Sequence, residues 1–193
     1  MRDQDLRQAV LRKVLAEYVK DPNSRVVEEL GLQHGSNRVD IAVVNGVLHG
    51  YELKSEADNL DRLQGQIESY SKVFDRVTLV TTSNHLSHAV KQIPEWWGVK
   101  LASRGIRGGI NISNVRKPRK NPSVSPFHIA QLLWRNEAIA ILEMAGADKK
   151  MLRTNRAGLY QLLTELFDTA SLREHVRQAL KCRENWRDQS LLG

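Results

Sequence analysis

The spacing of apolar and polar positions changes several times along the chain, and each change predicts a new element of secondary structure. Over residues 3–19 apolar side chains recur every three or four positions, as on one face of an amphipathic helix. Residues 25–32, 38–44 and 47–54 are instead rich in Val, Ile and Leu, which is typical of strands. The dipeptide Asn45-Gly46 between the last two segments favours a tight hairpin turn.

After this hairpin, helical and strand patterns alternate. A helix is expected to begin at Asp58 or Asn59, since either residue is a good N-cap, and its inner face would carry Leu60, Leu63, Ile67, Tyr70 and Val73. A strand over 76–82, a helix over 84–92 and two short strands over 99–102 and 110–115 follow. This order predicts an α/β fold with a mixed sheet flanked by helices.

The composition changes at residues 116–126, which read RKPRKNPSVSP. Four cations and three prolines in eleven residues exclude a helix or a central strand, so we expect a linker or an extended arm. The chain is therefore divided into a body over 1–115, the basic Pro-rich linker, and an all-helical extension over 127–193.

Three helices are predicted in the extension, over about 127–145, 149–168 and 171–189, with a break in the second at Gly158. Gly146 is expected to end the first of them. Ser171 and Glu174 have the spacing of a capping box at the start of the third.

Charge is distributed unevenly between the two halves of the 193-residue chain, which has a net charge of +7. Residues 1–99 carry 12 Lys and Arg against 14 Asp and Glu, whereas residues 100–193 carry 17 against 8. A basic second half indicates either a polyanionic partner or a merely solvated basic surface.

The cysteine count and the hydropathy pattern exclude several kinds of site and segment. Cys182 is the single cysteine, which excludes an internal disulfide and a cysteine-based zinc cluster. The sequence has neither an 18-residue apolar run nor the pattern of a secretory signal, so we expect no membrane span and a cytoplasmic location.

Three charged residues stand on the apolar strands of the predicted hairpin: Asp40, Glu52 and Lys54, in the pattern D-x11-E-x-K. Glu52 and Lys54 share a face because strand side chains alternate. Taken singly, each is better explained as a solvated edge charge. Together, on strands of Val, Ile, Leu and Ala, they favour a site that holds a hard divalent cation beside a reacting phosphate.

Each member of this pattern has an expected role. Asp40 and Glu52 would bind Mg²⁺ or Mn²⁺, and the backbone carbonyl of Leu53 would add a ligand. Lys54 would either position the attacking water or neutralise charge on the phosphate. We favour the second role, because two neighbouring carboxylates stabilise a charged ammonium.

The strand-borne D…E-x-K, with a helix and a strand after it, resembles the PD-(D/E)XK nuclease superfamily. Gln66-x-x-x-Tyr70 on the following helix is similar to the Q-x-x-x-Y motif of the RecB-type branch, and an i, i+4 pair shares one helix face. The run from Arg38 to Val80, continuing through LLWRNEA at 132–138, also resembles uncharacterised bacterial and phage-borne proteins of that superfamily. The proline that precedes the superfamily's aspartate is replaced by Val39.

The resemblance implies a restriction-endonuclease-like fold and metal-dependent hydrolysis of nucleic acid by Asp40, Glu52 and Lys54. Gln66 would orient a phosphate or a metal-bound water. Tyr70 would buttress the site or contact the backbone of the nucleic acid, with simple packing an equal alternative. A further acidic ligand is expected on the first strand or helix, with Glu29 preferred over its rival Glu17.

Residues that would contact phosphate are expected in the linker and on the last helix: Arg116, Lys117, Arg119, Lys120, Arg173, Arg177 and Lys181, supported by Arg153, Arg156, Arg183 and Arg187. Trp96 and Trp97 would either stack on bases or, more simply, anchor a loop. His49 lies close to the motif but its strand position turns it away from Glu52.

The expected function is a divalent-metal-dependent nuclease acting on DNA rather than RNA, in a phage, mobile-element or defence setting. The alternative is a nuclease-like scaffold that binds nucleic acid or a protein without cutting.

Overall fold

Six strands form a single sheet in the order β1-β2-β3-β4-β5-β6 in the computed structural model, which describes residues 1–184. Their bounds are β1 Arg25–Leu32, β2 Asn37–Val44, β3 Leu48–Lys54, β4 Arg76–Thr82, β5 Gly98–Arg104 and β6 Ile110–Arg116. β1, β2 and β3 pair antiparallel, β3, β4 and β5 pair parallel, and β6 returns antiparallel to β5. The predicted mixed sheet is confirmed.

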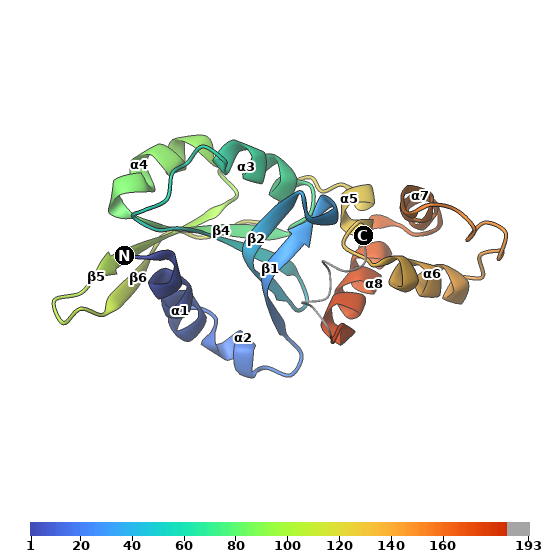
Figure 1. Ribbon diagram of the computed structural model, residues 1–193, viewed down its shortest axis with the longest axis horizontal. Coiled ribbons are helices and arrows are strands. Elements are labelled where there is room, and N and C mark those ends of the chain that lie inside the picture. Colours follow the sequence, from blue (N-terminus) through green and yellow to red (C-terminus); the bar gives the residue numbers. More distant parts are fainter. Residues whose placement is uncertain (185–193) are drawn as a thin grey trace.

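Helices cover both faces of this sheet (Figure 1). On one face, α1 (Asp3–Lys13) and α2 (Ala16–Lys20) follow each other, and Leu6 and Val10 pack on Ile41 and Leu53. On the other face lie α3 (Leu63–Ser71) and α4 (Ser83–Gln92), which connect the parallel strands. Parallel strands require such crossovers, because a short turn cannot return the chain to the same end of the sheet.

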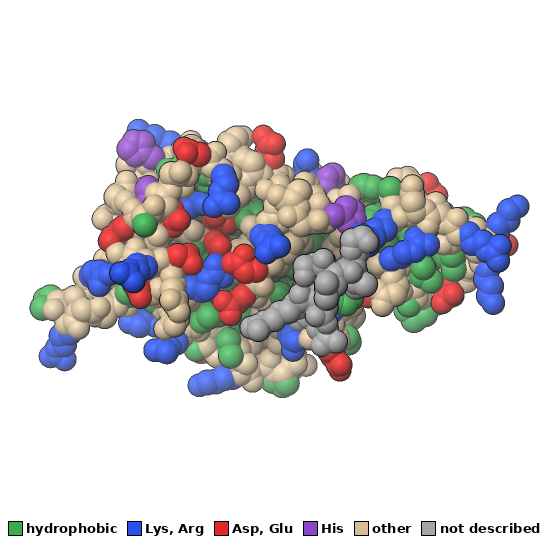
Figure 2. Space-filling model, viewed as in Figure 1, with side chains coloured by type: hydrophobic (Ala, Val, Ile, Leu, Met, Phe, Trp, Pro, Cys, Tyr) green, Lys and Arg blue, Asp and Glu red, His purple; other side chains and the backbone are tan. Residues whose placement is uncertain are grey.

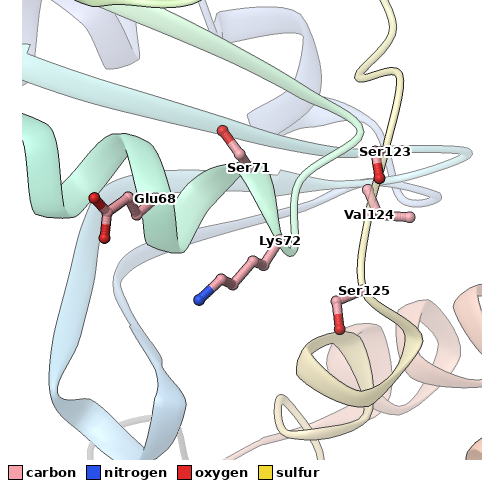
Figure 3. Close-up of a pocket in the computed structure, with 6 residues that line it drawn as sticks. All are labelled: Glu68, Ser71, Lys72, Ser123, Val124 and Ser125. Carbon is pink, nitrogen blue, oxygen red and sulfur yellow. The ribbon is translucent and has the colours of Figure 1, made fainter.

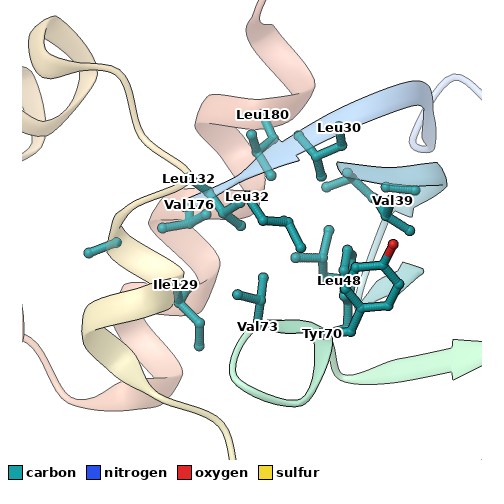
Figure 4. Packing of buried hydrophobic residues seen from close by; sticks show 14 of the residues in the cluster. Leu30, Leu32, Val39, Leu48, Tyr70, Val73, Ile129, Leu132, Val176 and Leu180 are labelled. Atoms are coloured by element: carbon teal, nitrogen blue, oxygen red, sulfur yellow. The ribbon is translucent and has the colours of Figure 1, made fainter. Parts of the chain in front are cut away.

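The helical extension packs on the sheet rather than standing apart from it. It comprises α5 (Pro126–Ala130), α6 (Arg135–Met144), α7 (Arg156–Leu166) and α8 (Thr169–Cys182). Apolar side chains from β1, β2 and β3 meet those of α5 and α8 in one buried cluster that includes Leu30, Val39, Leu48, Ile129, Val176 and Leu180 (Figure 4). The body and the extension therefore share a hydrophobic core.

Two of the predicted helices are each broken into two. The helix expected over 3–19 ends at Lys13, where the backbone N–H groups of Val14 and Leu15 both donate to the carbonyl of Val10. This turn buries Leu15 completely, whereas α2 contributes no buried residue. The helix expected over 127–145 stops at Ala130 and resumes at Arg135, with the backbone N–H of Trp134 donating to the Glu137 carboxylate over 2.7 Å.

The predicted helix starts were wrong where a polar side chain caps a different turn. α3 begins at Leu63, because Asp58 accepts the backbone N–H of Ser55 (2.7 Å) instead of capping a helix, and Asn59 likewise accepts from Asp61. α7 begins at Arg156, so Gly158 lies inside it and no break occurs there.

The last helix, in contrast, begins before the predicted position, at Thr169. α8 is capped by Asp168, which accepts the backbone N–H of Ser171 over 2.8 Å, so the capping box predicted for Ser171 and Glu174 is wrong. Gly146 ends α6 as expected, with a positive φ of 81°. The end of the helix predicted over 171–189, with Arg187, lies outside the described residues.

The segment between β6 and α5 has no regular secondary structure, as its prolines predicted, but it is pinned to the body. Asn121 donates its side-chain amide to the carbonyls of Ser71 and Phe74, each over 2.8 Å, and its backbone N–H to Asp75. Within residues 1–184, none of the helices has the length and apolar character needed to cross a membrane.

Candidate active site

β2 and β3 separate at Asp40. Their regular pairing ends at Ile41 opposite Tyr51, and beyond it the Asp40 carboxylate accepts the backbone N–H of Leu53 through Oδ2 at 2.7 Å. A side chain thus takes the place of a backbone acceptor. The regular ladder between these two largely buried strands is therefore interrupted at Asp40.

The alternation of faces along β2 is interrupted at the same residue. Ile41 and Val43 face the core under α1, and Ala42 faces α3, yet Val39 also lies in the α3-side core. The pairing of β1 with β2 skips Glu29 and Asp40, which lie between the pairs Glu28–Ile41 and Leu30–Val39, and Glu29 has a φ of 55°, in the left-handed region. That conformation is strained for a residue with a Cβ, by roughly 1–3 kcal/mol, and such strain is common at functional sites.

Glu52 lies at the centre of the predicted site and is only 2% exposed. Its Oε1 atom lies 2.9 Å from the Lys54 ammonium and accepts a hydrogen bond from the Gln66 amide over 2.6 Å. Its Oε2 atom lies 2.6 Å from the Tyr70 hydroxyl. The structure therefore brings together the E-x-K of β3 and the Q-x-x-x-Y of α3, which the sequence places on different elements.

Tyr70 packs its ring in the core and also contacts Glu52 with its hydroxyl. Its ring is fully buried, stacks on Trp97 with 5.9 Å between ring centroids, and meets Phe74 edge to face. Its hydroxyl also lies 2.7 Å from the carbonyl of Arg38. Burial, followed by the neighbouring Glu52, raises the pKa of Tyr70, so the phenol stays protonated and acts as a hydrogen-bond donor.

Arg7 is a member of this cluster that the sequence patterns did not identify. From α1, its Nη1 donates to the Asp40 carbonyl over 2.9 Å, and its Nη2 lies 3.1 Å from Asp40 Oδ1. The same Nη2 atom lies 2.7 Å from the Glu29 carboxylate. Its position beside Leu6, at the edge of the apolar stripe of α1, is the sequence signal that points it toward the sheet.

The surroundings of Asp40 shift the pKa of its carboxyl group. Burial, and then the proximity of Glu52, raise the pKa of Asp40 to about 7, against the opposing effects of the Leu53 N–H and of Arg7. A buried carboxyl group whose pKa is raised by burial and by a second carboxylate is common at functional sites.

The donor set fits a hard divalent cation. Asp40 and Glu52 supply two carboxylates, and Leu53, whose carbonyl is the third predicted ligand, lies between Glu52 and Lys54 on β3. Mg²⁺ is held by one or two carboxylates plus waters and phosphate oxygens, so two are sufficient. The buried Oε1 of Gln66 has no hydrogen-bond partner in the described chain, which leaves an acceptor for a bound water. Over residues 1–184, no three His, Cys, Asp or Glu side chains are grouped so as to hold an ion.

Of the two candidates for an additional acidic residue, Glu29 is near the site. It contacts Arg7, which also contacts Asp40, and its side chain is half exposed. Glu17 lies on α2 and is exposed. Figure 2 shows acidic and basic side chains intermingled on the face between α1 and α3.

The cations predicted to bind phosphate have diverse surroundings. Arg116 is half-buried and donates to the carbonyls of Trp97 (2.7 Å) and Pro94 (3.0 Å), so it holds the turn before β5. Lys117, Arg119 and Lys120 are exposed. On α8, Arg173 contacts the buried carboxylate of Asp75, Arg177 contacts Glu174, and Lys181 is half-buried.

Trp97 is buried and His49 is half-buried. Trp97 is completely buried, as expected for an anchor. His49 stacks on Tyr51 and bonds to Thr78 over 2.9 Å; burial, and then nearby cations, lower the pKa of His49 to about 3.

A shallow groove of about 450 Å³ lies at the C-terminal end of α3, away from the inward-facing Gln66 and Tyr70. Its walls come from the end of α3, the residue after it, and the chain leading into α5, and all but one are polar: Glu68, Ser71, Lys72, Ser123, Val124 and Ser125 (Figure 3). None of the predicted site residues lines it.

Comparison with known families identifies the chain's relatives. The family model described as bacteriophage P4 protein cII matches residues 1–193. The chain belongs to this cII family. The family match spans the sheet and the helical extension together, which agrees with their shared core. The expectation of a phage-borne relative is confirmed.

One curated member of the cII family is similar in sequence. Protein cII of Enterobacteria phage P4 is 26% identical over 124 residues, which cover 64% of this chain and 47% of that protein. The chain thus matches less than half the length of this relative.

Proposed function

We propose that this cII-family protein is a divalent-metal-dependent nuclease that hydrolyses phosphodiester bonds, with DNA favoured over RNA. The observation that carries the proposal is the convergence of Lys54, Gln66 and Tyr70 on the buried carboxylate of Glu52, whose neighbour Leu53 donates its N–H to Asp40. A buried Glu and Lys on one strand have little structural use. In a phosphodiesterase they serve as a ligand and as a counter-charge.

The resemblance to the PD-(D/E)XK nucleases supports the same proposal. In that superfamily, the D…E-x-K pattern and the Q-x-x-x-Y helix belong to one site. The contacts of Gln66 and Tyr70 with Glu52 agree with such an arrangement. The finer assignment to the RecB-type branch is part of the proposal.

Each residue has a proposed role in hydrolysis. Asp40, Glu52 and the Leu53 carbonyl would hold Mg²⁺ or Mn²⁺, which when bound supplies a Lewis acid for the phosphate and its attacking water. Lys54 neutralises negative charge that builds on the phosphate. Gln66 uses its unpaired Oε1 to accept a hydrogen bond from the water and so orient it. Tyr70 fixes Glu52.

The test is cleavage of linear, circular, single-stranded and branched DNA, and of RNA, with Mg²⁺ or Mn²⁺. Asp40→Asn and Lys54→Met should each abolish cutting while the circular dichroism spectrum is unchanged. Glu68→Gln is the matched control, because Glu68 is an exposed carboxylate on the outer side of α3. Undiminished cutting by Asp40→Asn would rule out the assigned site.

A second function, nucleic-acid binding without hydrolysis, is favoured by one observation. Arg7 contacts both Asp40 and Glu29 and so provides a built-in positive charge within the acidic cluster. In a protein that binds nucleic acid without cutting it, Arg7 would keep these ion pairs and no metal ion would be needed. Salt-dependent retention of DNA, with no cutting under any divalent ion, would select this alternative.

A further inference from the structure

The β5–β6 hairpin projects from the edge of the sheet at which the candidate site opens. Because β3, β4 and β5 are parallel, their carboxyl ends lie at one edge, with Lys54 beside Thr81 and Thr81 beside Leu101. β5 then continues for three residues, to Arg104, before the chain turns. Figure 1 shows this hairpin extending beyond the body of the molecule, next to the start of α1.

The base of the hairpin is close to the site. Arg104 is near enough to Glu56 to help lower the pKa of that carboxyl, after the larger effect of its hydrogen bond with the amino terminus. Glu56 follows Lys54 by two residues. On β6, the second strand of the hairpin, the carbonyl of Ile110 accepts a hydrogen bond from the Lys13 ammonium of α1 over 2.6 Å. The base of the hairpin therefore lies near the end of β3.

The turn itself is closed by hydrogen bonds, so its tip is held in a defined position. Gly105 donates its N–H to the carbonyl of Gly109 over 2.7 Å, and Gly108 donates to Gly105 over 2.9 Å. Gly108 has a φ of 78°, which a residue with a side chain rarely adopts.

The tip presents one aliphatic side chain between two cations. Ile106 is completely exposed, and Arg104 and Arg107 are exposed on either side of it. A single exposed isoleucine is unremarkable by itself. On a projecting hairpin between two guanidinium groups, it has the composition of a wedge that enters DNA: cations for the phosphates and an apolar side chain for the base stack.

We propose that the tip of this hairpin, residues 104–110, is a wing that engages double-stranded DNA beside the candidate site. Arg104 and Arg107 contact phosphates on the two sides of a groove, and Ile106 inserts against a base step. The inference rests on the proposed function for the identity of the substrate, and it names that substrate as duplex DNA.

The experiment measures binding of the full chain to a short fluorescent duplex in EDTA, where no metal-dependent cutting takes place. Arg104→Gln/Arg107→Gln should weaken binding and lower the slope of log affinity against log salt by about 2, since each phosphate contact contributes close to one. Lys20→Gln/Lys91→Gln removes two exposed charges from helices elsewhere and should leave both quantities nearly unchanged.

Ile106→Ala tests the wedge separately from the charges. It should weaken binding by about tenfold, the effect of exposing one buried aliphatic side chain, with the salt slope unchanged. A 2-aminopurine in the duplex should brighten on binding of the wild type, because its base is unstacked, and should not brighten with Ile106→Ala.

The result that overturns the wing is duplex binding by both hairpin variants equal to that of Lys20→Gln/Lys91→Gln. If Arg104→Gln/Arg107→Gln and Ile106→Ala bind normally while the wild type cuts DNA, the wing alone is refuted. If the hairpin variants lose binding but no ion supports cutting by the wild type, the wing stands and the proposed hydrolysis is refuted.

Discussion

One nitrogen of Arg7, Nη2, lies between two carboxylates: 3.1 Å from Asp40 and 2.7 Å from Glu29. These residues come from α1, β2 and β1, so the contact joins three elements at the point where β2 and β3 part. The guanidinium places a positive charge beside Asp40, where the proposed function would also place a metal ion.

We predict that Arg7→Met makes the protein more dependent on divalent cations. Without the guanidinium, Asp40 and Glu29 repel each other, and the melting temperature in EDTA should fall. Addition of Mg²⁺ should then raise the melting temperature more in the variant than in the wild type, because the ion has no guanidinium to compete with.

Arg12→Ala is the control for this experiment, since Arg12 is an exposed cation on the same helix. Its response to Mg²⁺ should equal that of the wild type, as measured by differential scanning calorimetry. If Mg²⁺ raises the melting temperature of Arg7→Met no more than that of the wild type, Arg7 does not compete with a divalent ion for Asp40.

The raised pKa of Asp40 predicts a pH dependence of stability. In the folded protein the pKa is about 7, against 3.8 as its ordinary value, so the folded state holds the proton more tightly. The stabilisation from this proton is full below pH 3.8 and is lost as pH rises to about 7, a difference of roughly 2–4 kcal/mol. Urea unfolding in EDTA should show this loss for the wild type and not for Asp40→Asn.

The sheet could be predicted because its signals are local. The Asn45-Gly46 turn and the Val-rich strands specify the β2–β3 hairpin within a few residues, and all six strands are found at the expected places. Helix ends were less predictable. Asp58 can cap a helix or a turn, and the choice depends on where Ser55 lies after β3 has been placed.

The candidate site was predictable to the extent that its motifs have fixed spacing. Glu52 and Lys54 are two apart, and Gln66 and Tyr70 are four apart, so each pair shares a face before any tertiary structure is known. Arg7 belongs to no such motif. The helix period indicates that Arg7 faces the sheet, but its contact with Asp40 depends on how α1 packs across the sheet, a long-range feature that the period does not encode.

Tyr70→Phe separates the packing of the ring from the action of the hydroxyl. The ring keeps its stack on Trp97, while Glu52 and the Arg38 carbonyl lose their contact with the phenol. We expect a loss of about 1–2 kcal/mol in the free energy of unfolding, measured in urea. If Tyr70 only packs, the variant should be as stable as the wild type and equally active.

The shared core predicts that the sheet and the helical extension unfold together. Leu180 of α8 is fully buried in the cluster that contains Leu30 and Val39, so Leu180→Ala should destabilise the whole chain by about 2–5 kcal/mol. Near-ultraviolet and far-ultraviolet circular dichroism should then give one coincident transition, shifted to lower temperature in the variant.

Leu166→Ala is the matched control for this last experiment, because Leu166 at the end of α7 is 49% exposed. Its transition should stay close to that of the wild type. Two separate transitions in Leu180→Ala, one for the sheet and one for the helices, would show that residues 127–184 form an independent folding unit. The contact between Arg173 and the buried Asp75 argues against such independence. It joins α8 to the turn before β4, and its loss would leave the Asp75 carboxylate without this partner.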